Sequence, residues 1–451
     1  MTTDDNERTL RTADRGRAVA HAPRTGDGHP LPYASVWMAA AGVFLFGLVG
    51  ASAPNHNTLR AAVTWLRLPA MSGTVSQVAT SVAIVLSCAG TLGMLNAQGR
   101  GWRPDPRTLF RAGAFAVLLV ADLTPIGSSD TASYAAYGRI AALGGDPYVT
   151  TPAQLGGAYA HLVSDAWRDT PSVYGPVGTW WQAAAAFVGG GQPWLTIWAL
   201  MLVNAAVFLA TGYLLMRTAD DPVRAALLWS ANPLLIGVLA GGGHLDTVIA
   251  ALAVAAVHVA RRASGWREDL LVGALVGLAC GVKISAALVG VGVVWPLLCR
   301  GLWQRAFRVA GTAALTLAVL YGGYGLHALD PLTEAAHMVS RPSLWAVFEQ
   351  VAADLAGLGT AATAVGVLWP VLMLGLALVV HRYLPAEAPA AVTVPFALAF
   401  AWILTAPWSM PWYAALPCAL AALFRHVRLT QALLAATAVL ALLNNGGGHG
   451  W

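Results

Sequence analysis

The chain has 451 residues, of which 57% are hydrophobic and only 10% are charged, and its mean hydropathy is +0.62. Soluble globular domains carry about 25% charged residues, so this composition excludes an ordinary soluble protein. The formal net charge of +5 comes from basic residues that lie mostly between apolar segments, which relates it to membrane topology and not to nucleic acid. We therefore predict an all-α polytopic membrane protein that is surrounded by membrane lipids and has no nucleic-acid partner.

The first segment, 1–33, is polar and rich in Arg and Asp, and is predicted to be a disordered cytoplasmic tail. A membrane domain over 34–444 and a flexible tail over 445–451 follow. Apolar segments that could form membrane helices recur through the membrane domain, and no internal repeat is visible. The predicted spans are 34–52, 79–97, 109–123, 193–216, 222–240, 244–260, 269–282, 284–299, 306–326, 359–381, 389–405, 411–424 and 429–444.

The arginines orient these spans, because loops on the cytoplasmic side of a membrane carry the excess of positive charge. With the N-terminal tail in the cytoplasm, twenty of the 25 arginines fall on the cytoplasmic side. This topology requires 177–190 to be a short re-entrant or juxtamembrane helix, since a further crossing would invert every later loop. The arginines on the outer side are then Arg60, Arg67, Arg139, Arg168 and Arg341.

Lys283 is the single lysine of the chain, and it lies inside the apolar stretch 270–298. One helix over this stretch would reach about 43 Å, too long for an upright span, so we predict two short helices with Lys283 at the outer turn between them. A cation in a membrane segment is costly and usually faces a cavity or an anion. Lys283 could therefore contact an anionic ligand, or form a structural ion pair with Asp246.

Several polar elements meet on the outer face under this topology. They are the insertion 122–176, the turn 241–246 with His244 and Asp246, Lys283, the loop 327–345 with Arg341, and the turn 407–413 with Trp412 and Tyr413. Their convergence from distant parts of the chain predicts an external active site. Asp246 could instead cap a helix, and the two aromatic residues could belong to an interfacial belt.

The densest polar cluster lies inside the insertion, over 129–148. From Asp130 to Leu143 the pattern predicts an interfacial helix that Ser129 or Asp130 could cap, and the Gly-Gly-Asp-Pro sequence after it predicts a turn. On physical grounds alone, Asp130 could be a capping residue or a catalytic carboxylate. Asp122, at the end of a span, could be a solvated helix-end residue or a catalytic base.

A family resemblance is carried by Asp130-Thr131-Ala132-Ser133-Tyr134-Ala135-Ala136-Tyr137-Gly138-Arg139, Gly145-Asp146-Pro147-Tyr148 and Val173-Tyr174-Gly175-Pro176. With these motifs the chain resembles the polyprenyl-phosphate-mannose-dependent α-1,6-mannosyltransferases, actinobacterial GT-C glycosyltransferases that build lipomannan-type chains. The resemblance continues through Gly243-His244-Leu245-Asp246, Lys283 and Pro411-Trp412-Tyr413, and covers most of the chain after the tail. It implies a GT-C-type bundle of about 13 transmembrane helices in the plasma membrane, with a helical first external loop over 122–176 and the active site on the outer face.

The resemblance further implies that mannose passes, with inversion, from polyprenyl-phosphate-mannose to a lipid-linked α-1,6-mannan acceptor, without a metal or another cofactor. Asp130 matches the family's acidic residue near the start of the first external loop and is the expected general base, with Asp122 as the alternative. The expected contacts of the donor phosphate are Lys283, Arg139 and Arg341. The expected acceptor or sugar contacts are Tyr134, Tyr137, Asp146, Tyr148, Tyr174, His244, Asp246, Trp412 and Tyr413.

Other interpretations stay open. Arg139 could extend toward lipid headgroups, and Tyr148 and Tyr174 could be interfacial anchors. The chain could be a GT-C enzyme that uses another lipid-phosphate sugar, such as arabinose or glucose, or a transporter or flippase of a lipid-linked sugar. Transporters usually carry repeated halves, which are not seen here, and no Gly-rich strand–helix turn for a nucleotide sugar is visible. Both observations favour an enzyme with a lipid-linked donor.

Overall fold

The computed structural model describes residues 32–52, 68–341 and 343–445, and within these ranges it contains helices and no β-strand. Five helices are long and apolar enough to cross a membrane, and the described residues include a bent pair, 303–322 with 326–335, that would make a sixth. The chain is thus an all-α polytopic membrane protein. Of the predicted tails, residues 1–31 and 446–451 lie outside the described residues, and so do Arg60 and Arg67.

The helices before the polar insertion are α2, α3 and α4, and those inside it are short. Their bounds are α2 (Tyr33–Ala51), α3 (Gly73–Gly99), α4 (Pro106–Ala121), α5 (Asp130–Ala142), α6 (Pro152–Leu155), α7 (Gly157–Ala160) and α8 (Asp165–Arg168). The central helices are α9 (Pro176–Gly189), α10 (Pro193–Thr218), α11 (Pro222–Leu228), α12 (Pro233–Leu235), η1 (Ile236–Ala240), α13 (Asp246–Ala260), α14 (Trp266–Val282), η2 (Ile284–Ala286) and α15 (Ala287–Cys299). The remaining helices are α16 (Trp303–Gly322), η3 (Leu326–Leu329), α17 (Asp330–Ala335), α18 (Leu344–Ala356), α19 (Leu358–Arg382), α20 (Ala390–Thr405), η4 (Pro411–Ala414), α21 (Ala415–Ala421) and α22 (Val427–Leu443).

Local sequence explains where many of these helices begin. Proline occupies the first turn of α4, α9, α10 and α11, where the N–H that it lacks would have no helical partner. Asp105 and Asp221 cap α4 and α11 by accepting hydrogen bonds from backbone N–H groups. Helix starts are therefore largely set by short-range signals.

The predicted spans and the observed helices coincide in most places. Lys283 divides the stretch 270–298 as predicted, because α14 ends at Val282 and α15 begins at Ala287. Two predicted spans are interrupted. Within 222–240, Asn232 accepts N–H bonds from Leu234 and Leu235 and so starts a new helix, while 411–424 contains only η4 and the short α21.

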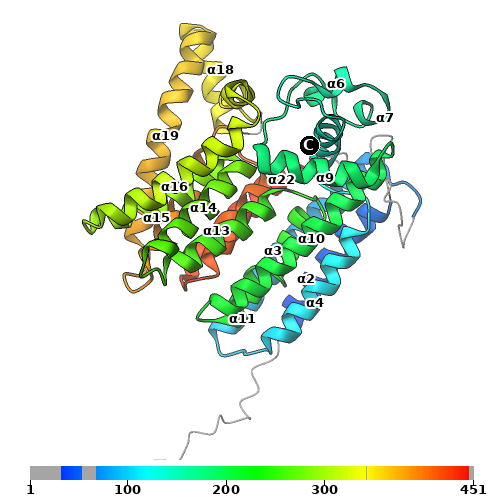
Figure 1. The fold of residues 1–451 in the computed structure, drawn as a ribbon. Helices are drawn as coiled ribbons and strands as arrows, with labels where there is room; N and C mark the ends of the chain where they lie inside the picture. Colours follow the sequence, from blue (N-terminus) through cyan, green and yellow to red (C-terminus); the bar gives the residue numbers. More distant parts are fainter. Residues whose placement is uncertain (1–31, 53–67, 342, 446–451) are drawn as a thin grey trace, which may run out of the picture.

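The number of membrane crossings, about 13, stays a prediction. Apart from the five long spans, the described chain has shorter apolar helices at 246–260, 284–299, 390–405 and 427–443. One helix, α18, is absent from the sequence-based prediction, and its sequence contains the charged residues Glu349 and Asp354. It packs along α19 and has no buried residue; the end of α19 beside α18 projects from the bundle (Figure 1), whereas the rest of α19 packs on α20.

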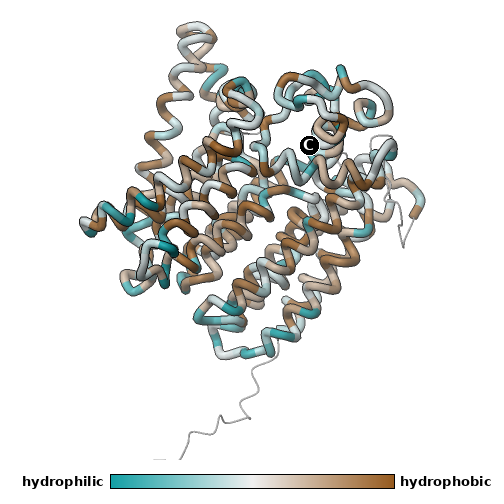
Figure 2. Tube along the Cα trace, in the orientation of Figure 1, coloured by the Kyte–Doolittle hydropathy of each residue, from teal (hydrophilic) through white to brown (hydrophobic). Residues whose placement is uncertain are grey.

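The antiparallel succession of helices gives the bundle two different ends. The insertion, the 241–246 turn, Lys283 and the 406–414 turn lie at one end, and the arginine-bearing loops around 100–105, 261–267 and 300–305 lie at the other (Figure 1). Figure 2 shows hydrophobic residues along the helices and hydrophilic residues gathered in the connecting segments. This is the arrangement expected of a protein whose helices face lipid.

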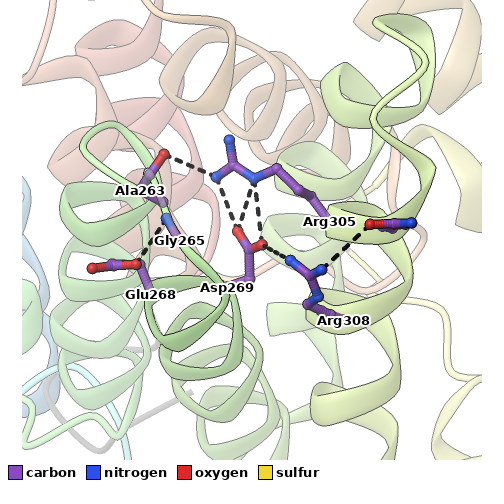
Figure 3. Close-up of polar contacts among 7 residues, drawn as sticks. Ala263, Gly265, Glu268, Asp269, Arg305 and Arg308 are labelled. Carbon is purple, nitrogen blue, oxygen red and sulfur yellow. Dashed lines mark hydrogen bonds and ion pairs between the residues drawn. The ribbon is translucent and has the colours of Figure 1, made fainter.

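A polar network joins α14 to α16 at the arginine-bearing end (Figure 3). Asp269 is 1% exposed and accepts hydrogen bonds from Arg305 Nη2 at 2.9 Å and from Arg308 Nη1 at 3.3 Å. Arg305 also donates to the carbonyl of Ala263, 3.0 Å away. The buried carboxylate is thereby paired with two cations, which fixes the register of the two helices.

Candidate active site

A cavity of about 890 Å³ lies at the end of the bundle that holds the insertion. Its polar side chains come from five separate parts of the chain, and its apolar wall comes from α15, α19 and α20. The polar group includes Asp130, Lys283, Arg341, Asn444 and Asn445, and the apolar wall includes Ile284, Leu288, Val291, Trp369, Met373 and Trp402. The structure therefore brings together residues that the sequence analysis placed on one face from the pattern of arginines.

Asp130 begins α5, the helix predicted from Asp130 to Leu143. No side-chain hydrogen bond caps this helix at Ser129, whereas Ser128 Oγ accepts the backbone N–H of Asp130 at 3.0 Å. Two groups approach the same carboxylate oxygen: the Tyr134 hydroxyl donates to Oδ2 at 3.3 Å, and His244 Nδ1 lies 3.4 Å from it. The Asp130 side chain is thus directed at the cavity and its neighbours, and the expected side-chain cap is absent.

Electrostatics favour the ionised form of Asp130. Burial acts to raise the pKa of this carboxyl group, but the contact with His244 and the positive charge of Lys283 outweigh it, so the pKa lies below its ordinary value. Burial raises the pKa of Tyr137 and of Tyr174, which line the same cavity. At neutral pH the Asp130 carboxylate therefore lies among the neutral phenol groups of Tyr137 and Tyr174.

Lys283 occupies the break between α14 and η2, with an extended backbone (φ −157°) that ends α14. Its Nζ lies 3.5 Å from Asp246 Oδ1 and 3.8 Å from the centre of the Tyr413 ring. Its side chain is 16% exposed and lines the cavity. The ion pair and the cavity position, which the sequence left as alternatives, occur together.

His244 follows a turn of three glycines and is buried. Its ring stacks on Trp412, with 3.8 Å between ring centres and 11° between ring planes. The turn needs glycine: Gly243 has φ +68°, and a Cβ on Gly242 would lie 2.7 Å from the His244 ring. His244 is not among the residues that line the large cavity, and it reaches the site through Asp130.

The predicted tyrosines divide into two groups. Tyr174 lines the cavity and meets Tyr134 edge to face at 5.0 Å, and the Tyr137 hydroxyl donates to the carbonyl of Thr170 at 2.9 Å. Tyr148 lies elsewhere: it contacts Tyr324 edge to face at 4.9 Å, and its hydroxyl is 3.0 Å from Thr179 Oγ1. Trp412 and Tyr413 line the cavity beside Tyr174.

Three further predicted residues do not line this cavity. Asp122 accepts a hydrogen bond from Trp198 Nε1 at 2.8 Å. Arg139 places its guanidinium 5.9 Å from the centre of the Tyr159 ring. Asp146 binds the Tyr148 N–H at 2.8 Å and His327 Nε2 at 2.7 Å, which links the insertion to the loop after α16.

The cavity also contains Trp402 and Asn445, which the sequence analysis did not assign to it, and Trp167 and Trp408, which lie in the predicted elements 122–176 and 407–413. Trp402 stacks on Tyr413 at 4.8 Å, and Trp167 contacts Trp408 edge to face at 6.1 Å. Asn445, expected at the start of a flexible tail, instead donates to Gln77 O and Ser81 Oγ at 2.8 Å each. Trp402 lies in an apolar segment and Asn445 precedes a glycine-rich one, so no pattern marks these two residues. Among the described residues, no group of three or more His, Cys, Asp or Glu could hold a metal ion.

Comparison with known proteins identifies relatives of this chain. It is 28% identical to alpha-(1->6)-mannopyranosyltransferase A of Corynebacterium glutamicum over 38% of the chain and 35% of the relative. It is 32% identical to a probable alpha-(1->6)-mannopyranosyltransferase of Mycolicibacterium smegmatis over 46% of the chain and 39% of the relative. It is 24% identical to alpha-(1->6)-mannopyranosyltransferase A of Mycobacterium tuberculosis over 90% of the chain and 82% of the relative.

The first two alignments therefore span only about a third of the length of those relatives, 35% and 39%. No solved structure matches the chain significantly. The sequence profile described as "Alpha-(1->6)-mannopyranosyltransferase, N-terminal domain" matches residues 33–299, which is more than half of the chain. The chain therefore belongs to the alpha-(1->6)-mannopyranosyltransferase family.

Proposed function

We propose that this chain is a GT-C-type mannosyltransferase of the plasma membrane. It moves mannose from polyprenyl-phosphate-mannose to a lipid-linked α-1,6-mannan acceptor at the outer face of the membrane. The observation that carries the proposal is that Asp130 and Lys283, from distant elements, line one cavity whose other wall is apolar. The printed names of the relatives supply the sugar and the linkage, and the cavity supplies a base, a cation and an apolar surface.

The proposed reaction is one displacement at C1 of the mannose. The acceptor oxygen attacks from the face opposite to the phosphate, and Asp130 takes the hydroxyl proton. The new C1–O bond forms as the C1–O bond to phosphate breaks, so polyprenyl phosphate leaves with the electron pair and the configuration at C1 inverts. The lowered pKa of Asp130 supports this role, because only the ionised carboxylate can accept the proton.

The charge of the leaving group needs a cation in a site with little water. Lys283 is assigned to this role, with Arg341 as the second cation on the same cavity. The polyprenyl chain is assigned to the apolar wall beside Lys283, formed by Ile284, Leu288 and Val291 with α19. Val291 is 56% exposed, so this wall reaches the surface that faces lipid. A donor could therefore keep its lipid tail in the membrane while its phosphate meets Lys283.

The sugar is assigned to the aromatic end of the cavity. Tyr137, Tyr174, Trp412 and Tyr413 line this end, and aromatic side chains with polar groups suit the apolar face and the hydroxyls of a hexose. Asp246 contacts Lys283, and His244 contacts Asp130. These two residues therefore support this end of the cavity indirectly. Asp122, Arg139, Asp146 and Tyr148 receive no direct role in this proposal, because they lie away from the cavity.

The test is mannosyl transfer in membranes from a strain that lacks its own enzyme. Labelled polyprenyl-phosphate-mannose is supplied with a short α-1,6-mannose acceptor, and the wild type is compared with Asp130→Asn and Asp122→Asn at equal expression. Asp130→Asn should lose about 10²- to 10⁴-fold of the rate, as expected for a general base, while Asp122→Asn should stay near the wild type. Loss in Asp122→Asn alone would move the base to that residue.

The donor sugar is tested in the same membranes. Lipid phosphates that carry arabinose or glucose replace the mannose donor, and uptake of the intact lipid-linked sugar across the membrane is followed in parallel. Mannose transfer should exceed transfer of the other sugars. Transfer of another sugar alone would change the donor, and movement of the lipid without formation of a product would identify a flippase.

A further inference from the structure

His244 Nδ1 is a buried polar atom without a hydrogen bond to any described residue. The side chain is 1% exposed, and Nδ1 lies 3.4 Å from Asp130 Oδ2, slightly beyond hydrogen-bond geometry. A buried polar group that lacks a partner costs stability, and such groups are rare in native proteins. Contacts in catalytic sites are often long before substrate binds and shorten afterwards. The position of this nitrogen therefore indicates a contact that is completed during function.

The local fold holds the His244 ring in one orientation. Trp412 stacks on one face of the ring at 3.8 Å, and the close approach of Gly242 leaves no room for a side chain on that part of the turn. A Cβ on Gly243 would lie 2.5 Å from Met201 Sδ. Because the ring cannot turn freely between these groups, Nδ1 stays directed at Asp130. A histidine that served packing alone would not need to point at a carboxylate.

We propose that His244 is a positioning residue for the base of the reaction: its Nδ1–H closes onto Asp130 Oδ2 when substrate binds and holds the carboxylate ionised and correctly turned. This inference rests on the function proposed above. The Tyr134 hydroxyl approaches the same oxygen, at 3.3 Å. With Oδ2 held by two donors, Oδ1 is the oxygen that takes the proton of the acceptor hydroxyl.

Asp130 faces charged or titratable groups from several elements, and each contributes to its ionisation. Lys283 stabilises the carboxylate from the α14–η2 break, and burial opposes the ionised form. Asp246 and Tyr413 lie behind Lys283, and Tyr134, Tyr137 and Tyr174 surround Asp130 from the insertion. Removing the His244 contact should leave Lys283 as the main stabilising charge, so the pKa of Asp130 should rise without reaching that of a fully buried acid.

Two substitutions separate the Nδ1 contact from the packing of the ring. His244→Phe keeps a ring that can stack on Trp412 but has no donor. His244→Asn places an amide N–H near the position of Nδ1. In the transfer assay His244→Phe should lower kcat about 10- to 100-fold, the range expected for a hydrogen bond to a charged group, with KM for the donor unchanged. His244→Asn should recover most of the rate.

The pH profile gives the second readout. A base is active when it is deprotonated, so its activity falls as pH drops through its pKa. Because His244→Phe raises the pKa of Asp130, the acidic limb of kcat/KM should move to higher pH, and His244→Asn should return it toward the wild type. An unmoved limb, or equal losses in the Phe and Asn variants, would overturn the inference and leave His244 a packing residue.

Thermal unfolding provides a readout that does not depend on transfer. The wild type, His244→Phe, Asp130→Asn and the double variant are compared in detergent. The two single shifts in Tm should not add in the double variant, because the 3.4 Å approach of His244 Nδ1 to Asp130 Oδ2 already couples the two side chains before substrate binds. Additive shifts would overturn the inference even in an active enzyme. A wild type that transfers no mannose would refute the proposed function, and the unfolding cycle would still decide whether His244 and Asp130 are coupled.

Discussion

At the scale of a single side chain, Lys283 both forms an ion pair and lines the cavity. Asp246 is 5% exposed and pairs with it, and the Tyr413 ring lies below its ammonium group. These partners hold the Lys283 ammonium group at the edge of an apolar cavity and leave part of it directed at the cavity. The sequence predicted that Lys283 mattered because a lone cation is costly in an apolar segment. It could not decide between ion pair and ligand contact, since both satisfy the same charge.

Single and double substitutions should separate the ion pair of Lys283 with Asp246 from its proposed contact with the donor phosphate. Lys283→Met leaves Asp246 buried without a partner, so Tm should fall, and transfer should drop about 100-fold or more because the leaving phosphate loses its cation. Lys283→Met with Asp246→Asn should recover much of the Tm but not the rate. Thermal unfolding and the transfer assay on the same preparations check this. Recovery of the rate together with Tm would show that Lys283 is only structural.

Helix positions were the part of the fold that the sequence predicted best, because apolar length and short-range caps determine them. The division at Lys283 and the helix from Asp130 followed from these signals. The interruption at Asn232 and the helix α18 did not. The first is a short-range cap, in which Asn232 accepts the N–H groups of Leu234 and Leu235, inside a run whose apolar composition predicts a single span. The second is an amphipathic helix that packs mainly on α19.

The contact between the insertion and α14 is close enough to be tested with one methyl group. Gly175 N donates to the carbonyl of Val282 at 3.0 Å, and a Cβ on Gly175 would lie 2.3 Å from the carbonyl oxygen of Gly281. Gly175→Ala should push the insertion away from Lys283, costing about 1–3 kcal/mol of stability and most of the transfer activity. Gly191→Ala is the matched control, since nothing lies within 4 Å of its Cβ. Equal Tm and activity in both variants would contradict this view of the contact.

A second contact joins the insertion to the loop after α16. His327 Nε2 lies 2.7 Å from Asp146 Oδ2, and Tyr148 packs against Tyr324 beside it. The pair is partly exposed, so His327→Ala should lower the free energy of unfolding by less than about 1 kcal/mol and should change Tm only slightly. Hydrogen exchange should nevertheless become faster in both 146–150 and 324–330. The exposed His337 offers a control, and faster exchange in only one of the two segments would argue against a shared contact.

At the scale of the whole molecule, the sequence predicted that distant polar elements converge, and the cavity contains members of all of them except the 241–246 turn, which reaches it through the contacts of His244 with Asp130 and of Asp246 with Lys283. The arginine pattern sufficed for this, since it fixes which helix ends share a face. It could not reveal which side chains point inward. Arg139 belongs to the same motif as Asp130 and Asp146 to the next one, yet Asp146 contacts His327 and Arg139 contacts Tyr159. Such directions depend on packing between helices and leave no periodic trace.

The orientation in the membrane can be tested with native and introduced thiols. Of the four cysteines, Cys299 is exposed and the others are buried, and it lies at the arginine-bearing end. A membrane-impermeant maleimide should label Cys299 only after the cells are permeabilised. In a Cys299→Ser background, His161→Cys, on the exposed surface of the insertion, should be labelled in intact cells. The reverse pattern would invert the topology and place the cavity on the cytoplasmic face.

The end of α22 has a practical consequence for anyone who handles this protein. Asn444 and Asn445 line the cavity, and Asn445 is tied to Gln77 and Ser81 of α3. A fluorescent protein or affinity tag fused shortly after Asn445 would start at the rim of the cavity, where it could obstruct substrates. Tyr33 begins α2 at the opposite end of the bundle, so a fusion partner placed before it is the safer choice for purification and imaging.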